Sequence, residues 1–347
     1  MTKKRTYLDI LTLIALLAIA ISNVSTDVWN ATTEIGDAWN LYGWLTVATR
    51  WGLPLLISTF GIVCLNKDMS FSNHTVYCKF LPQTVISCAV WWCVSALIYL
   101  QTNFPNEIDF DTFLECMSSV LDAPYNIGFL QMIVVLFAFY PLLSRIAKND
   151  KLLTYAVITT FVICMFFPML ENIPYVRYIT LFTNQINWNF FTPYALYLFL
   201  GVWASRKSFE WHHRVVIYCL GLLSTVAMFS LTKIFSAGSI AIDSRFMNDN
   251  SPFIAFQVLA LITLLKQIFK QDIQNRKINR LFTDLSKNRY GYVAMYMIGF
   301  GFISGFISEK HIVLLVGATF LFVNGLCLIL RRLPIISYLI SDYEDVR

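Results

Sequence analysis

The apolar residues of this chain come in blocks of about twenty, and this pattern limits its fold more than any other feature. A helix of that length crosses the roughly 30 Å hydrocarbon layer of a bilayer. The 347 residues are 57% hydrophobic and 14% charged, with a mean hydropathy of +0.61, whereas soluble domains carry about 25% charged residues. Backbone amides in lipid must be hydrogen-bonded within the protein, which favours helices. The sequence therefore predicts an all-α, polytopic integral membrane protein.

Ten segments are predicted as membrane spans. They cover residues 7–23, 42–65, 81–101, 126–145, 152–170, 189–205, 214–234, 253–269, 290–308 and 311–330. No low-complexity linker or soluble domain separates them, so residues 1–347 are predicted to form a single membrane domain. The polar, basic stretch between the eighth and ninth spans is predicted to be able to form an amphipathic helix at the inner leaflet.

The distribution of charge supports ten spans with both termini in the cytoplasm. When the loops are assigned alternately, 21 of the 26 basic residues fall on the side of the N-terminus. The outer loops hold only Arg177, Arg245 and Lys310, and the spans hold Arg50 and Lys233. This segregation follows the positive-inside rule. The net charge of +5 therefore reflects topology in a plasma membrane, and no nucleic-acid partner is predicted.

Several common kinds of site are not indicated. Only Cys116 of the eight cysteines falls in an outer loop, so no disulfide framework is predicted. The adjacent pair His212 and His213 would point about 100° apart on a helix, and no metal site is predicted there. Nucleophile-elbow, zinc-protease and P-loop motifs are all missing from the sequence.

Arg50 is the most unusual residue of the second span, because the rest of residues 42–64 carries no charge. A charge at that depth costs about 2.5–3.5 kcal/mol on insertion scales unless it is paired or faces water. Two interpretations stay open. Arg50 either binds an anionic ligand, or it clamps backbone carbonyls at a kink caused by Pro54.

Other polar residues are predicted to lie near Arg50 in the outer half of the bundle. Asn23 ends the first span, Asn126 begins the fourth, and Asn189 begins the sixth together with Thr192. Such a group could line an outward-facing polar cavity. Buried asparagines also commonly hydrogen-bond between packed helices, so a purely structural role stays open.

The order of several motifs resembles the membrane acyltransferase-3 family, in particular its surface-polysaccharide O-acetyltransferase branch. The main matches are YLDIL at 7–11, DVW at 27–29 and RWGLP at 50–54 with Gly61. Looser matches are Lys79 with Pro82, Tyr125 with Phe129 and Leu130, Pro141 to Leu143, Phe199 to Gly201, and Ser286 with Tyr290 and Gly291. The similarity covers nearly the whole chain.

The resemblance implies an enzyme that passes an acyl group from acetyl-CoA or another acyl-CoA to a hydroxyl of an envelope glycan or lipid-linked sugar. It implies membrane lipid and that glycan as partners, and no metal. Asn23 and Asn126 occupy positions where the family has histidines, so they are the candidate catalytic residues. Arg50, Lys79, Asp9 and Asn189 are the candidate donor- or substrate-binding residues, although Asp9 is also explained as an interfacial residue near Lys3 to Arg5.

The two asparagines leave the activity open. An asparagine side chain cannot accept a proton near neutral pH, so it cannot replace a histidine general base. Acyl transfer would then need another base, such as an acidic residue of the outer loops. The alternative is a catalytically inactive relative that binds or transports a lipid-linked or sugar substrate.

Overall fold

The computed structural model describes residues 6–32, 34–66, 71–104, 109–122, 127–171, 193–237, 241–269, 276–307 and 311–340. These ranges are helical, with turns and loops and no strand, which confirms the all-α prediction. Six of the described helices are long and apolar enough to cross a membrane, or seven if one bent pair is counted as a single span. The chain is thus a helical protein of membrane-spanning character, and its ten spans and its orientation remain predictions.

The contacts of the chain divide it into two compact units. The first unit contains Met1–Ser70 and Leu142–Phe282, and the second contains Phe71–Pro141 and Thr283–Arg347. Each unit therefore combines segments that are far apart in the sequence.

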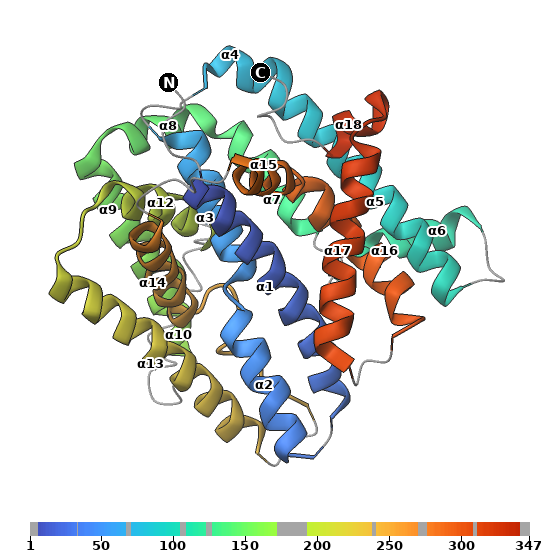
Figure 1. Ribbon diagram of the computed structural model, residues 1–347, viewed down its shortest axis with the longest axis horizontal. Coiled ribbons are helices and arrows are strands. Elements are labelled where there is room, and N and C mark those ends of the chain that lie inside the picture. The colour runs from blue at the N-terminus through green and yellow to red at the C-terminus, as the bar shows by residue number, and fades with distance from the viewer. Residues whose placement is uncertain are drawn as a thin grey trace. The chain divides into compact units, whose positions relative to one another are not determined.

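The first unit is built around α1 (Thr6–Ala31), α2 (Asp37–Thr49) and α3 (Gly52–Leu65). Its remaining helices are α8 (Tyr140–Lys148, which begins at the unit boundary), α9 (Asp150–Phe161), η2 (Val162–Phe166), α10 (Phe167–Glu171), α12 (Pro193–Arg206), α13 (Trp211–Ser236) and α14 (Pro252–Ile268). In Figure 1, α2 and α3 run beside α1, and α13 lies beside α14. The helix α15 (Arg276–Ser286) crosses the boundary between the two units.

Small residues let the helices of the first unit approach closely. A Cβ on Gly61 would meet the backbone of Leu198 in α12, and a Cβ on Gly201 would meet the backbone of Ser58 in α3. Ser58 Oγ also donates a hydrogen bond to the Tyr197 carbonyl at 2.9 Å. Contacts of this kind hold membrane helices together, because lipid supplies no hydrophobic force between them. The α3–α12 pair is therefore the tightly packed centre of this unit.

The predicted second span is interrupted at Arg50. Arg50 ends α2 and Trp51 precedes α3, and both keep right-handed helical dihedral angles. Pro54 has no N–H to offer the Arg50 carbonyl four residues earlier, so the helical hydrogen-bond ladder loses one bond here. The kink expected from this proline stays a prediction. A Cβ on Gly52 would lie 2.8 Å from the Ile19 nitrogen, so the chain passes against α1 immediately after the break.

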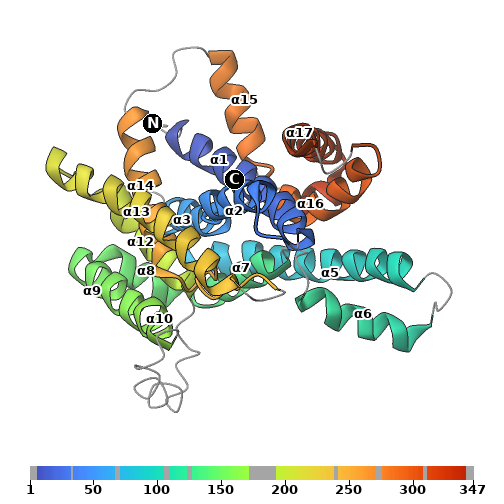
Figure 2. The same cartoon turned by 90° about the horizontal axis from the view of Figure 1, so that it is seen from below.

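The second unit holds the remaining helices. They are α4 (Asn73–Thr75), η1 (Val76–Phe80), α5 (Leu81–Asn103), α6 (Phe110–Asp122), α7 (Ile127–Ala138), α16 (Arg289–Ser304), α17 (Ile312–Leu330) and α18 (Pro334–Ile340). Figure 2 shows α6 lying along α5. Gln83 and Trp91 of α5 donate hydrogen bonds to carbonyls of α18, which joins the two sequence segments of this unit.

Candidate functional site

Arg50 contacts a loop that lies almost two hundred residues later in the chain. Its Nε donates a hydrogen bond to the Met247 carbonyl at 2.9 Å, and the side chain is half-buried. This bond agrees with the clamp interpretation. Among the described residues, none accepts a hydrogen bond from the two terminal nitrogens of Arg50. The guanidinium therefore holds the loop with one nitrogen and keeps its terminal fork available to an anion.

The same loop brings a carboxylate to Arg50. Asp249 lies two residues after Met247, and its Oδ2 accepts a hydrogen bond from the Tyr194 hydroxyl at 3.1 Å. The Tyr197 hydroxyl donates to the Asp249 carbonyl at 2.8 Å. The charges of Arg50 and Asp249 both act on the two tyrosines. Arg50, Asp249, Tyr194 and Tyr197 therefore lie in one cluster, the Arg50 neighbourhood. Arg50 and Asp249 are both half-buried and form no direct ion pair with each other.

Internal contacts order residues 241–251, which precede α14. Arg245 forms a forked ion pair with Asp243, in which Nε lies 2.9 Å from each carboxylate oxygen, and its guanidinium carbon is 5.0 Å from the centre of the Phe235 ring. The hydrogen bonds from Arg245 lower the pKa of Asp243 below its ordinary value of 3.8, and partial burial opposes the shift only in part. The loop is thus a defined structure that can position Met247 and Asp249.

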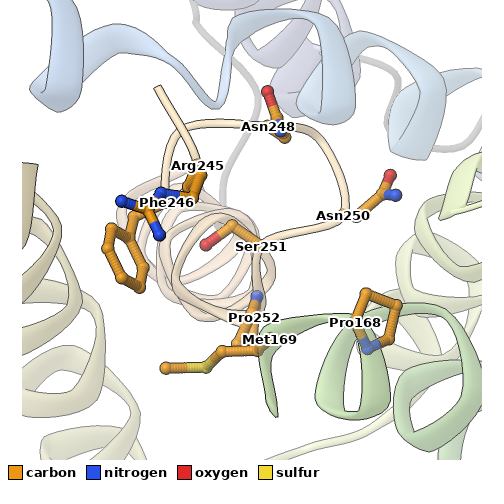
Figure 3. Close-up of a pocket in the computed structure, with 8 residues that line it drawn as sticks. All are labelled: Pro168, Met169, Arg245, Phe246, Asn248, Asn250, Ser251 and Pro252. Carbon is orange, nitrogen blue, oxygen red and sulfur yellow. The ribbon is translucent and has the colours of Figure 1, made fainter. Parts of the chain in front are cut away.

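A pocket of about 180 Å³ lies between this loop and α10. Figure 3 shows the loop as an arch that carries Asn248 and Asn250, with Pro168 of α10 across the pocket from Arg245. Ser251 also lines it, and its Oγ is buried with no hydrogen-bond partner among the described residues. A buried hydroxyl in this state is costly unless water or a ligand satisfies it. The pocket can therefore hold a small polar group beside the Arg50 neighbourhood.

Asn23 lies on α1 at the level of Arg50. Below it Ile19 packs against Gly52, and above it Ser25 Oγ accepts a hydrogen bond from Thr46 Oγ1 at 2.9 Å. The Asn23 Nδ2 atom is buried and has no hydrogen-bond partner among the described residues, and the same is true of Ser22 Oγ. The prediction that Asn23 and Arg50 occupy the same part of the bundle agrees with these contacts. No hydrogen bond joins them.

Of the other predicted site residues, the structure describes Asp9 and Lys79. Asp9 is in the same helix as Asn23 but fourteen residues earlier, roughly 20 Å along the axis. Lys79 is exposed in η1 of the second unit. Asn126, Asn189 and Thr192 lie outside the described residues, so their predicted roles remain predictions.

Sequence reasoning missed Asp249, Tyr194 and Tyr197. Asp249 lies in the loop between α13 and α14, which the charge pattern predicts to be an outer loop. Only the hypothesis that an acidic residue of the outer loops could act as the base bears on it. The two tyrosines are three residues apart on α12 and thus share a helix face, a spacing that could have indicated a joint role. Nothing in the sequence pairs them with residue 50.

The histidine pair is closer together than sequence reasoning expected. Atoms of Glu210, His212 and His213 that could bind a metal all lie within 4.8 Å of one another, and all three residues are exposed. His212 Nε2 lies 2.9 Å from Glu210 Oε2, and this contact accounts for the arrangement. The group lies at the positive N-terminal end of α13, which is unfavourable for a cation.

The Arg50 neighbourhood thus combines a cation, a carboxylate, phenolic hydroxyls and an unpartnered amide within one unit. A cation can hold an anionic group or a developing oxyanion, and a carboxylate can accept a proton. Comparison with known proteins adds no family to this description: no family model matches the chain, and no curated protein or solved structure is significantly similar to it.

Proposed function

We propose that this chain is a membrane O-acyltransferase of the plasma membrane. It transfers an acyl group, most simply acetyl from acetyl-CoA, to a hydroxyl of a cell-envelope polysaccharide or lipid-linked sugar. The proposal joins the motif resemblance to one structural observation. The carboxylate of Asp249 lies in the Arg50 neighbourhood. It could replace the histidine of the family, whose position is occupied by Asn23 in this chain.

Asp249 has the properties that the missing base requires. The Tyr194 hydroxyl occupies Oδ2, so Oδ1 remains free to accept the proton of the acceptor hydroxyl. The hydroxyl oxygen of the acceptor, as it loses its proton to Asp249, attacks the acyl carbonyl carbon. The carbon–sulfur bond then breaks, and the leaving thiolate takes the proton from Asp249 and departs as CoA thiol, which restores the carboxylate. The terminal nitrogens of Arg50 would stabilise the oxyanion that forms at the carbonyl.

A second candidate function is a non-catalytic protein that binds or transports a lipid-linked or sugar substrate. It is supported by the bond between Arg50 and the Met247 carbonyl, which gives the arginine a structural role without any chemistry. The presence of asparagine at position 23 also supports it, because this side chain binds polar groups but does not exchange protons near neutral pH.

The test compares variants of the full chain in lipid nanodiscs with radiolabelled acetyl-CoA and an envelope glycan fraction. Asp249→Asn should keep donor binding and lower ester formation about 10²–10⁴-fold, as expected for loss of a general base. Arg50→Gln should weaken donor binding and transfer together. Asp111→Asn, an exposed Asp→Asn change in α6 of the second unit, is the matched control and should leave both unchanged.

Two outcomes would overturn the proposal. Ester formation that survives Asp249→Asn would remove Asp249 as the base. If the wild-type protein binds donor or glycan but forms no ester, the non-catalytic function replaces the enzymatic one. In that case Asn23→His tests whether transfer can be restored by a histidine at the family's position.

A further inference from the structure

An apolar groove lies on the surface of the first unit, and it shares no lining residue with the polar pocket beside Asp249. It encloses about 230 Å³ between α9, α12 and α14, and its accessible lining is made of apolar atoms. Leu196 and Leu200 of α12 form a buried floor, with 0% and 6% of their surfaces exposed. Ile158 on α9 and Leu259 on α14 stand on opposite walls. The groove thus presents an apolar lining on the surface of the helices.

The two ends of the groove differ. At one end the rings of Phe161 and Phe256 meet across it, with centroids 5.6 Å apart. At the other end Trp203 Nε1 donates a hydrogen bond to Thr154 Oγ1 at 3.2 Å. The groove is therefore narrowed by aromatic rings at one end and bordered by polar groups at the other.

Basic residues surround the polar end. Lys151 and Lys207 are exposed, and they lie about one helical turn beyond Thr154 and Trp203. Arg206 binds Asp150 at 2.9 Å, and Lys266 donates hydrogen bonds to the Ser205 and Lys207 carbonyls. Arg206 and Lys266 thus fix this end of the unit, while the two exposed lysines face outward and favour an anionic partner.

The dimensions fit one alkyl chain. Seven residues separate Thr154 from Phe161, which corresponds to a groove about 10 Å long. That length is roughly two thirds of one leaflet, because the hydrocarbon layer is about 30 Å thick. A helix of the same length with a diameter of about 10 Å needs roughly 800 Å³, several times the observed volume. The groove is therefore too small for a partner helix.

We propose that this groove binds one acyl chain of an anionic phospholipid, with the phosphate of its headgroup at Lys151 and Lys207. The acyl chain packs against the apolar floor, and the aromatic pair Phe161 and Phe256 limits how deeply it inserts. The two lysines favour an anionic headgroup over a zwitterionic one. The lipid is a bound structural or regulatory component. This site does not depend on acyl transfer at Arg50.

The experiment uses the full chain in nanodiscs that contain a phospholipid with a photoreactive diazirine in its acyl chain. Cross-linked peptides should map to α9, α12 and α14, and labelling by the anionic phosphatidylglycerol probe should exceed labelling by the zwitterionic phosphatidylcholine probe. Ile158→Trp and Leu259→Trp, which enlarge a side chain on each wall, should each lower groove labelling at least fivefold. Leu222→Trp is the matched control, because Leu222 is 70% exposed on α13 and outside the groove.

The lysines are tested separately. Changing Lys151 and Lys207 to glutamine should lower labelling by the anionic probe by about fivefold per lysine and leave the zwitterionic probe unchanged. Equal labelling by the two wild-type probes would overturn the selection of an anionic headgroup. Cross-links spread evenly over α13 and the groove, or unchanged labelling in both tryptophan variants, would overturn the site. Labelling that a second protein copy or a partner prevents would identify that protein as the occupant instead.

Discussion

The helices α3 and α9 both belong to segments that are long and apolar enough to cross a membrane, but their surroundings are very different. In α3, thirteen of the fourteen residues are buried, whereas only Leu153 and Thr160 are buried among the twelve of α9. In an apolar stretch of 18 residues within each segment, 72% of the residues are buried in Asp37–Leu65, compared with 22% in Asp150–Leu170. Hydropathy thus identifies a segment that suits a membrane but does not distinguish a helix surrounded by protein from one that faces lipid.

The largest expected effect comes from a matched pair of isoleucines. Ile57 of α3 has none of its surface exposed, whereas Ile158 of α9 is 59% exposed. Ile57→Ala should lower the free energy of unfolding by about 2–5 kcal/mol, because it leaves a cavity among packed atoms. Ile158→Ala should change it by less than about 0.5 kcal/mol. Denaturant unfolding of both variants in one detergent measures the difference, and equal losses would mean that α9 is also packed against protein.

A second test adds volume to the α3–α12 contact. Gly201→Ala places a methyl group against the Ser58 backbone, which cannot move aside as a flexible side chain could. We expect a loss of about 1–3 kcal/mol in the free energy of unfolding. Gly317→Ala in α17 is the control, because no atom lies within 4 Å of the added carbon. Thermal unfolding of the two variants should separate them, and a neutral Gly201→Ala would contradict the close approach of the two backbones.

The third prediction concerns the hydrogen bond that Arg50 makes at the end of α2. Arg50→Met keeps much of the aliphatic length but removes the donor to the Met247 carbonyl. A hydrogen bond to a charged group is worth about 1.5 kcal/mol or more, so stability should fall by about that amount. Limited proteolysis should also cut the loop after α13 faster than in wild type. Unchanged cleavage would show that Arg50 does not hold this loop.

The smallest effect is expected from pH. Because the folded pKa of Asp243 lies below its ordinary value, the pair with Arg245 stabilises the fold above about pH 4. That contribution is lost as the pH falls through the lower folded pKa. Arg245 has 49% of its side chain exposed, so the effect should stay below about 0.5 kcal/mol. The unfolding midpoints of wild type and Asp243→Asn at pH 6 and pH 3 measure it, and their difference should shrink at pH 3.

Sequence reasoning predicted the local structure better than the site. The helical class follows from hydropathy and from backbone hydrogen bonding, both of which act within a single segment. Asn23 was placed near Arg50 because consecutive antiparallel spans meet at matching heights, and Ile19 against Gly52 supports this. The position of Asp249 near Arg50 was missed, because the sequence of a loop does not predict which helix the loop will contact.

The sequence by itself determined that this chain forms apolar helices. It also determined that one of them carries an arginine, whose charge is unfavourable in hydrocarbon unless it is paired. The tertiary structure alone decided that Arg50 meets Met247 and the neighbourhood of Asp249, and that α3 is enclosed while α9 borders a groove. The physical reason is the range of the forces. Backbone hydrogen bonds and transfer to lipid are set by each segment independently, whereas the partners of a side chain depend on how all the helices pack.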